Sequence, residues 1–296
     1  MKRESFGSRL GFILVSAGCA IGIGNVWKFP YICGAYGGAA FILIYLCFLV
    51  ILGIPVLVAE FAVGRGSHTS VAKCFDKLAP AGSCWKPLKF IGIIGCYMLM
   101  MFYTTVGGWM IYYCVKSLRG DFVGATPEAV TQSFSDMLGN APTMMLWMVI
   151  ICLIGFAVCF MGLQNGIEKI SKVMMSALLI IMVILAVHSV MMEGAGEGIS
   201  FYLIPDFQKI KEAGVGNVVF AALSQSFFTL SIGIGAMLIF GSYLDKSRSL
   251  TGEAVSITVL DTFVALTAGF IIIPACFSYG IQPDAGPSLI FITLPN

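Results

Sequence analysis

Long apolar stretches recur along this chain, and they constrain its fold more than any other feature. A helix of about 20 apolar residues crosses the hydrocarbon core of a bilayer, and seven segments reach that length. They run approximately over 10–35, 39–63, 88–115, 143–162, 168–192, 216–243 and 253–280. Only 11% of the residues are charged and the mean hydropathy is +0.95. Because soluble domains carry roughly a quarter charged residues, the sequence predicts an all-α polytopic membrane protein.

The basic residues between these segments orient the chain. Cytoplasmic loops are enriched in Lys and Arg, and a cytoplasmic N-terminus places most of the 17 basic residues on that side. The cytoplasmic ones are then Lys2, Arg3, Arg9, Arg65, Lys73, Lys77, Lys86, Lys89, Lys169, Lys172, Lys246 and Arg248, whereas Lys28, Lys116, Arg119, Lys209 and Lys211 lie at the outer side. We expect a multi-pass plasma-membrane protein of the bacterial inner membrane, with loops at 64–87, 116–142, 193–215 and 244–252. Nothing indicates a nucleic-acid partner.

Glycines interrupt the first apolar segment, in Gly18-Cys-Ala-Ile-Gly-Ile-Gly-Asn25. Glycine costs backbone entropy in a helix, and Pro30, a little further on, lacks a backbone donor. In hydrocarbon, freed backbone groups persist only where they are buried in protein or line a wet cavity. The sequence therefore predicts a helix broken at mid-membrane, which in transporters is where ligands bind.

The sixth apolar segment contains a similar interruption, Phe227-Phe-Thr-Leu-Ser-Ile-Gly-Ile-Gly235. The two interrupted segments are offset by five spans, so they cross the membrane in opposite directions. This predicts an inverted-repeat transporter. It would be a single membrane domain, 1–296, with helices 1–5 of the first repeat in 1–192 and helices 6–7, the start of the second, in 193–296. The alternative is that the glycines only let neighbouring helices pack closely.

The two breaks offer opposite kinds of ligand. Freed N–H groups at the start of a half-helix suit a carboxylate, and freed carbonyls suit a monovalent cation. The side chains of Asn25, Thr229 and Ser231 lie beside the glycines and could complete the shell of a cation. Glu60 and Asp261 are acids within spans, where facing lipid would be costly. This mixture fits a zwitterion together with a metal ion.

Several ordered motifs resemble the neurotransmitter:sodium symporter family, in particular its small bacterial amino-acid transporters of the LeuT type. These motifs are Arg9-Leu-Gly-Phe, Gly22-Ile-Gly-Asn25-Val-Trp-Lys-Phe-Pro30, Gly37-Gly-Ala-Ala-Phe41, Gly53-Ile-Pro-Val, Glu60-Phe-Ala-Val-Gly-Arg65 and Ser224-Gln-Ser-Phe-Phe-Thr-Leu-Ser231. The resemblance runs from about residue 3 to the end. It implies a LeuT-like fold with inverted repeats, of which this chain holds the first seven transmembrane helices of eleven or twelve, with helices 1 and 6 broken. It also implies sodium-driven import of an amino acid by alternating access.

The resemblance assigns ligand roles at the breaks, with two sodium sites and no organic cofactor. The first sodium would be bound by Ala20, Asn25, Thr229 and Asp261, and the second by the carbonyls of Gly18 and Ile21. The substrate carboxylate would meet the amides around Gly22, Ile23 and Gly24 and the hydroxyl of Tyr103. The rest of the pocket would be Ala20, Leu99, Ser231, Ile234 and an aromatic lid, Phe228. Gate residues would be Arg3, Phe6 and Tyr243 inside, and Lys28, Tyr103 and Phe228 outside.

Three positions depart from the family pattern. Lys28 stands where the family usually has Arg, and lysine lacks the planar fork of guanidinium, which favours a weaker outer gate. Asp261 stands where many members have Asn; its fixed charge would replace the chloride of animal relatives, so we expect chloride independence. Ser176, ten residues after Gly166, stands where some bacterial members carry proline. That substitution puts the unwinding of the fifth helix, seen in such relatives, in doubt.

Gly22 narrows the chemical class of the substrate. Monoamine carriers of the family have an aspartate there because their substrates lack a carboxylate, so glycine favours an α-amino acid. The predicted lining by Leu99, Phe228 and Ile234 is apolar, which favours a hydrophobic or aromatic side chain of the leucine, methionine, tyrosine or tryptophan class. Each methylene discriminates only weakly in such a pocket.

Two other classes of protein fit less well. A channel would need symmetric copies or a continuous polar pore. An enzyme is not expected, because His68 and His188 are isolated and no Gly-x-Gly-Asp or His-Glu-x-x-His pattern appears. The final residues, Phe291-Ile-Thr-Leu-Pro-Asn296, resemble the middle of an extracellular loop after the seventh helix. We therefore expect a C-terminally truncated chain, a fragment that does not transport alone because later helices complete the second sodium site and the outer gate.

Overall fold

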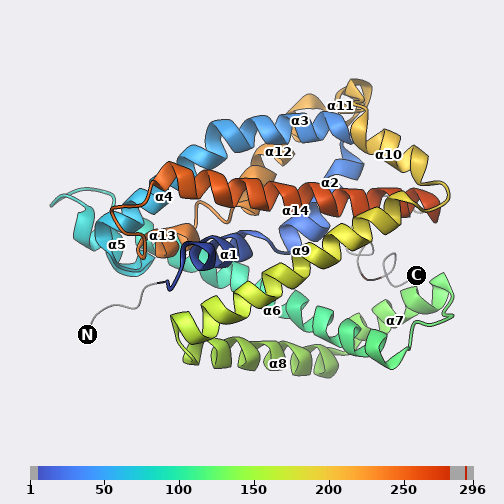
Figure 1. Cartoon of the computed structure of the whole chain (residues 1–296), viewed down its shortest axis with the longest axis horizontal. Helices are drawn as coiled ribbons and strands as arrows, with labels where there is room; N and C mark the ends of the chain where they lie inside the picture. Colours follow the sequence, from blue (N-terminus) through green and yellow to red (C-terminus); the bar gives the residue numbers. More distant parts are fainter. Residues whose placement is uncertain (1–5, 281–290, 292–296) are drawn as a thin grey trace.

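The computed structural model describes residues 6–280 and Phe291, and in this part of the chain all regular structure is helical. Figure 1 shows the elements lying roughly along one long axis, with the N-terminus at one end and α7 at the other. In chain order the helices are α1 (Arg9–Ala20), α2 (Phe29–Ala35), α3 (Ala39–Phe48), α4 (Ile54–Ser67), α5 (Val71–Leu78), α6 (Leu88–Arg119), α7 (Pro127–Gly139), α8 (Ala141–Phe160), α9 (Lys169–Val190), α10 (Ala195–Leu203), α11 (Phe207–Ala213), α12 (Val215–Thr229), α13 (Ala236–Gly241) and α14 (Leu250–Ser278).

Short π-helical stretches join some of these helices. They are η1 (Gly24–Lys28), η2 (Leu49–Gly53) and η3 (Leu163–Glu168). By length and composition, five helices of the described part can cross a membrane, and they run over 39–67, 88–119, 141–160, 163–190 and 250–278. The segment 163–190 is helical throughout, so the fifth span is not unwound here.

The first and sixth spans are the interrupted ones. Arg9–Ala20 and Gly24–Ala35 together are apolar enough to cross, but they meet at a bend of 55°. The sixth span consists of the apolar helix Val215–Thr229 and the short helix Ala236–Gly241, joined by a turn. Six of the seven apolar segments can thus cross a membrane if the bent first pair counts as one, and the sixth segment is helical on both sides of its break. The two broken segments are those marked by paired glycines.

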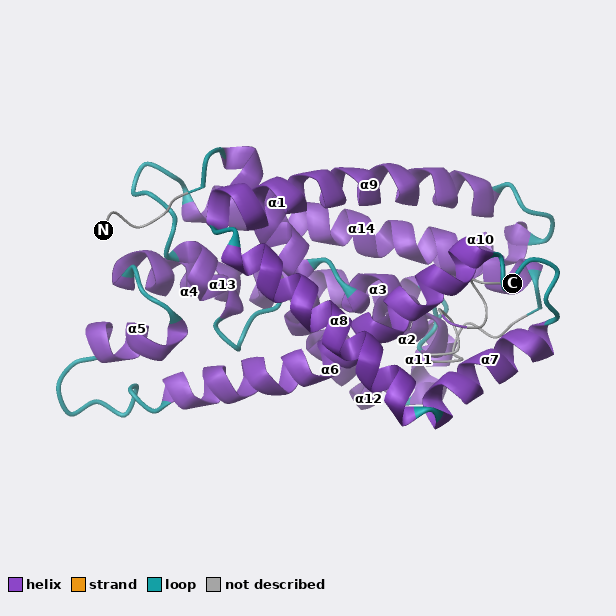
Figure 2. Cartoon of the chain, turned by 90° about the horizontal axis from the view of Figure 1, so that it is seen from below, coloured by secondary structure: helices purple, strands orange, loops and turns teal. Residues whose placement is uncertain are grey.

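The core is built around α14, which packs against α1, α2, α4, α9 and α10. Its residues Ile257, Val264 and Ala265 have no exposed surface. By contrast, α8 buries none of its residues and pairs mainly with α6. In Figure 2, α9 and α14 run side by side along the upper edge. The helix at the centre and the helix at the edge are both apolar enough to cross a membrane, but α14 faces other helices whereas α8 is largely exposed.

Three of the predicted loops contain short helices that the hydropathy pattern did not reveal. α5 lies in 64–87, α7 in 116–142, and α10 and α11 in 193–215. Side chains cap two of these helices at their N-termini. Thr126 Oγ1 accepts a hydrogen bond from the amide of Ala129, and Asp206 Oδ1 accepts from the amide of Gln208. Such helices depend on caps and packing rather than on an apolar run.

Candidate binding site at the two helix breaks

The first break begins where α1 ends. The amide of Ile21 still donates to Ala17 O at 2.6 Å, but Ile21 itself is extended, with φ −71° and ψ 113°. Its carbonyl is therefore turned out of the hydrogen-bond ladder of α1. The freed amide of Gly22 donates to Asn25 Oδ1 at 3.1 Å, and the helix resumes when Val26 N donates to Gly22 O at 3.2 Å. The break is short and is closed by a local side chain.

The second break follows Thr229, the last residue of α12, and is more contorted. Ser231, Gly233 and Gly235 all have positive φ, of 52°, 92° and 78°. Only glycine adopts this region without steric cost, so Ser231 is strained. Glu60, from α4, accepts hydrogen bonds from Gly233 N at 2.6 Å and from Leu238 N at 3.2 Å. A carboxylate from another span thus binds the amides that the second break leaves free.

A buried polar cluster connects the two breaks with α14. Asn25 Nδ2 donates to Asp261 Oδ1 at 2.8 Å and to Thr229 Oγ1 at 3.1 Å, and Thr229 Oγ1 donates to Asp261 Oδ2 at 2.8 Å. All three residues have no exposed surface. Within residues 6–280 no Lys, Arg or His nitrogen lies within 4.0 Å of the Asp261 carboxylate. The cluster therefore combines a buried carboxylate with neutral side chains whose oxygen atoms could bind a cation.

Further hydrogen bonds cross from one break to the other. Ser231 Oγ donates to Cys19 O at 3.1 Å. Gln225 Nε2 donates to Gly24 O at 3.0 Å, and Gln225 is completely buried. Carbonyls on both sides of the first break thus accept hydrogen bonds from side chains of the sixth span. Sequence reasoning assigned no role to Gln225, although a polar side chain inside an apolar span was the signal that could have drawn attention to it.

A cavity of about 520 Å³ opens beside the second break, between α6 and α12. Five predicted site residues line it, namely Leu99, Tyr103, Phe228, Ser231 and Ile234. The other lining residues were missed: Gly95, Met98, Phe102, Ser224, Phe227 and Ile232. Gly95 lies four residues before Leu99 and Phe102 three residues after it, so the helical spacing of α6 was a usable signal for these two. The lining is predominantly apolar.

The first break borders this cavity through close contacts of its glycines. A Cβ on Gly22 would lie 3.5 Å from Tyr103 Cε1, and a Cβ on Gly24 would lie 2.8 Å from two ring atoms of Phe228. Ala20, Ile23 and Gly24 are buried. Ala20 is not among the described residues that line the cavity. The structure thus places Gly22 beside Tyr103 and Gly24 beneath the ring of Phe228.

The remaining predicted ligands and gate residues occupy separate places. Gly18 faces α9, where a Cβ would lie 3.3 Å from Met175 Sδ. Lys28 Nζ lies 4.1 Å from the ring centroid of Phe228. At the other end of α1, the rings of Phe6 and Tyr243 meet edge to face with centroids 5.7 Å apart. Arg3 lies outside the described residues. The two predicted gates are therefore aromatic contacts on opposite sides of the first break.

Comparison with known proteins places this geometry in a family. The family model described as "Sodium:neurotransmitter symporter family" matches residues 3–128 and 125–295. The chain is 37% identical over 294 residues to the uncharacterized sodium-dependent transporter YhdH of Bacillus subtilis, covering 99% of this chain and 64% of that protein. It is 28% identical to the sodium-dependent serotonin transporter of Drosophila melanogaster, covering 99% of this chain and 53% of that protein.

A solved structure matches the fold closely. The crystal structure of MhsT in complex with L-phenylalanine superposes with a TM-score of 0.91 and 38% sequence identity, over 99% of this chain and 66% of MhsT. This match shows that the chain has an all-helical, LeuT-like fold. The chain spans a little under two thirds of the length of the first curated relatives that it matches.

Proposed function

The chain belongs to the sodium:neurotransmitter symporter family, and we propose that it carries the first seven spans of a sodium-coupled symporter that imports an amino acid by alternating access. Residues 1–192 then form the first inverted repeat, and 193–296 begin the second. The N-terminus lies in the cytoplasm, as the distribution of basic residues favours. Alternating access would move the interrupted spans about the site between them.

The observation that carries this proposal is the buried carboxylate of Asp261. An ionised carboxylate is costly to bury without a cation, and within residues 6–280 no basic side chain pairs with it. Its neighbours, Asn25 and Thr229, offer oxygen atoms, which are the ligands that hard cations prefer. A sodium ion bound there, with the carbonyl of Ala20 as a further ligand, would neutralise the carboxylate. Because sodium is a co-substrate in such a carrier, its binding would drive uptake.

The second sodium would bind to backbone carbonyls on the other side of α1. Ile21 has left the helical conformation, so its carbonyl is free to coordinate. Gly18, one turn earlier, lies close to α9. Its carbonyl and that of Ile21 would supply two ligands, and the remainder would come from helices beyond the seventh.

The substrate would bind with its carboxylate at the first break and its side chain in the cavity. The amides around Gly22, Ile23 and Gly24 begin a half-helix, where the helix dipole favours an anion, and Tyr103 lies beside Gly22. The apolar lining by Leu99, Phe228 and Ile234 would take a hydrophobic or aromatic side chain. MhsT, a structure of the same fold, is seen in complex with L-phenylalanine, which supports this class of substrate.

Phe228 would cover the bound substrate from the outer side. The ammonium of Lys28 lies over this ring and would hold it in place by a cation–π contact, which is worth about 0.5–2 kcal/mol. On the cytoplasmic side, Phe6 and Tyr243 close the end of α1, and Arg3 would join them. The carrier would need no chloride, because Asp261 already supplies the negative charge beside the sodium.

Binding of a radiolabelled amino acid to the full-length protein tests the proposal. We expect saturable binding of leucine- or phenylalanine-class substrates that requires sodium but is unchanged when gluconate replaces chloride. Gly22→Asp places a second carboxylate against that of the substrate and is expected to abolish binding. Gly22→Ala is the matched control, because its Cβ meets only ordinary contacts at 3.5 Å. Binding that is independent of sodium would overturn the coupling, and intact binding in Gly22→Asp would show that the carboxylate lies elsewhere.

A further inference from the structure

A second cavity lies far from the helix breaks, at the end of the molecule opposite the N-terminus. It has a volume of about 380 Å³ and is formed where the end of α6, the polar face of α7 and the first turn of α8 meet. Small-molecule sites typically have volumes of roughly 300–1,000 Å³. Unlike the cavity at the breaks, its lining is about half polar and includes one basic and one acidic side chain, Lys116 and Asp136.

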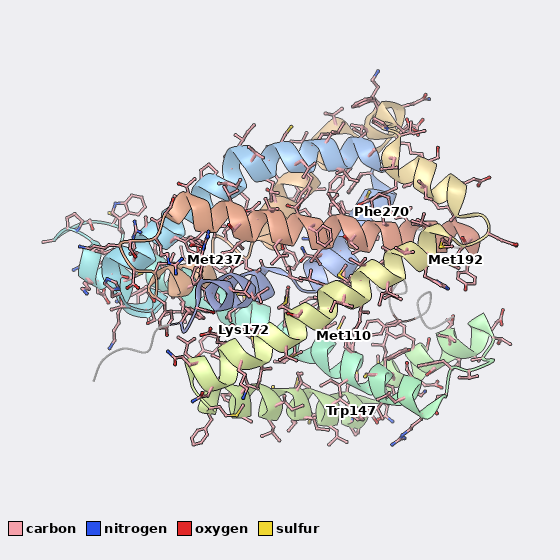
Figure 3. The ribbon with its side chains drawn as sticks, viewed as in Figure 1. Met110, Trp147, Lys172, Met192, Met237 and Phe270 are labelled. Atoms are coloured by element: carbon pink, nitrogen blue, oxygen red, sulfur yellow. The ribbon has the colours of Figure 1, made fainter. Side chains whose placement is uncertain are left out.

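Packing holds the walls of this cavity in place. Phe134 and Met137, on the inner face of α7, are buried against Tyr113 of α6. The ring of Tyr112 contacts that of Trp147, which marks α8 in Figure 3, with centroids 5.9 Å apart. Gln132 and Asp136 therefore project from the opposite face of a docked helix and hydrogen-bond to each other, Nε2 to Oδ1, at 2.7 Å. The cavity is a feature of three packed helices.

Lys116 brings a cation into the cavity without a carboxylate partner. Its ammonium donates to Ser133 Oγ at 2.6 Å and lies 5.5 Å from the ring centroid of Tyr112 and 5.6 Å from that of Phe122. In the described part of the chain, no Asp or Glu oxygen lies within 4.0 Å of it. A half-buried ammonium with two hydrogens to spare is suited to an anion. The first turn of α8, with Asn140 and Thr143 in the lining, adds the positive end of a helix dipole.

Asp136 gives the same cavity an opposite charge. Its carboxylate accepts one hydrogen bond from Gln132 and is exposed, so it retains acceptor sites for a cation. Because Lys116 and Asp136 line one cavity without pairing with each other, the site is matched to a ligand that carries both charges. A purely anionic ligand would be repelled by Asp136, and a trimethylated ammonium could not donate hydrogen bonds to it.

From this arrangement we propose that the cavity binds the headgroup of a zwitterionic membrane lipid, with the phosphate diester at Lys116 and a primary ammonium at Asp136. The acyl chains would run along α8. That helix is apolar over its whole length and buries none of its side chains in the described structure. Tyr112, towards the C-terminal end of α6, and Trp147, towards the N-terminal end of α8, are of the aromatic types that are enriched at membrane interfaces. The chemistry shared by lipid and soluble sources is a phosphoethanolamine group, and the lipid is favoured because the cavity adjoins this apolar helix.

Native mass spectrometry of the full-length protein tests the proposal. The probes are phosphatidylethanolamine, phosphatidylcholine and phosphatidylglycerol with identical acyl chains. We expect preferential retention of phosphatidylethanolamine. Lys116→Gln should weaken its binding about tenfold or more, as expected for losing a charged hydrogen-bond donor. Arg119→Gln is the matched control, because Arg119 lies in the same last turn of α6 but does not line the cavity. Equal retention of all three lipids, or equal effects of the two substitutions, would overturn the proposal.

A second variant does not depend on the integrity of α6. Asp136→Asn keeps the size of an exposed side chain and should remove the preference for phosphatidylethanolamine over phosphatidylcholine while leaving total lipid binding intact. Asp121→Asn, an exposed acid outside the cavity, should leave the preference unchanged. An unaltered preference in Asp136→Asn would contradict the assigned role. If water-soluble glycerophosphoethanolamine displaces the lipid at similar concentrations, the cavity takes a soluble ligand, and the lipid assignment is wrong.

Discussion

The two helix breaks look alike in the sequence but are stabilised in different ways. In the first, the freed amide of Gly22 is bound by Asn25, three residues away on the same segment, and no residue of that stretch has a positive φ. In the second, positive φ recurs three times within five residues, and the freed amides are bound by Glu60, which is 173 residues away from Gly233. The freed amide of the first break is thus bound within its own segment, whereas the freed amides of the second break depend on another span.

This difference indicates that the two breaks have different roles. A break closed by one neutral side chain can exchange that hydrogen bond for an ion or a carboxylate at little cost. A break bound by a carboxylate has its donors already satisfied and is better suited to act as a fixed wall. We infer that the first break carries the ligand-binding backbone groups and that the second provides the rigid surface beside the cavity. Substitutions at the two breaks can separate these roles.

The largest expected effect is on stability, from Glu60→Ala. This change leaves the amides of Gly233 and Leu238 without acceptors, and each unsatisfied group costs about 1–3 kcal/mol. We expect a loss of about 3 kcal/mol in thermal unfolding of the full-length protein in detergent. Glu60→Gln keeps one acceptor oxygen and should lose about half as much. Glu193→Ala, at an exposed acid, is the control, and equal melting temperatures for it and Glu60→Ala would show that the second break is stable without Glu60.

Asp261→Asn should weaken sodium binding without disrupting the fold. Two unit charges roughly 4 Å apart attract by about 4 kcal/mol at an effective dielectric of about 20, before desolvation is counted. We therefore expect at least a tenfold rise in the sodium concentration that half-saturates substrate binding, partly restored by chloride. Without sodium, the variant should melt at a temperature equal to or higher than that of the wild type, because an unpaired buried charge has been removed.

The comparison that checks Asp261→Asn is the sodium-induced rise in melting temperature, measured with and without chloride. Asp121→Asn, in an exposed turn, should keep the full rise. If Asp261→Asn keeps it as well and does not respond to chloride, the carboxylate is not a sodium ligand.

These contacts also show how far the sequence leads. The seven spans and both interruptions follow from local composition, because apolar length and paired glycines act within one segment. Asn25 and Thr229 were predicted as cation ligands from their places beside the glycines, and Asp261 was noted as an acid within a span. Only the family resemblance assigned all three to one sodium site, and the structure brings them within hydrogen-bonding distance of one another. The partners of Glu60 could not be predicted, because they are backbone amides of a turn far away in the sequence. Every residue type except proline carries such an amide, so the sequence does not indicate which ones Glu60 binds.

The missed short helices had a different cause. α7 and α11 lie in polar stretches, where no apolar run reaches the length of a span. Their caps, Thr126 and Asp206, were present in the sequence as helix-start signals. Hydropathy alone predicts that α7 and α11 are loops, whereas the capping residues predict that a helix starts there. The cavity between α6, α7 and α8 was consequently invisible, since one of its walls is α7.

Gly24→Ala tests whether the first break and the aromatic lid move together. The new Cβ would lie 2.8 Å from Phe228 Cδ1 and Cε1, so the ring must shift. Overpacking of this kind costs about 1–3 kcal/mol, and we expect most of it to appear as weaker substrate binding, because Phe228 lines the cavity. Gly22→Ala meets no such contact and should bind substrate almost normally. Equal affinities for the two variants would mean that Phe228 adapts freely and is not a lid held by the first break.

The smallest effect is expected at Ser231, where two contributions oppose each other. Ser231→Ala removes the hydrogen bond to Cys19 O but keeps a Cβ at a φ of 52°, so stability should fall by about 1 kcal/mol. Ser231→Gly loses the same bond but relieves the left-handed strain, which is worth about 1 kcal/mol or more, and should melt near the wild-type temperature. The pair thus measures the strain in the second break directly. If Ser231→Gly is less stable than Ser231→Ala, the strain is absent, and the rigidity of the second break rests on Glu60 alone.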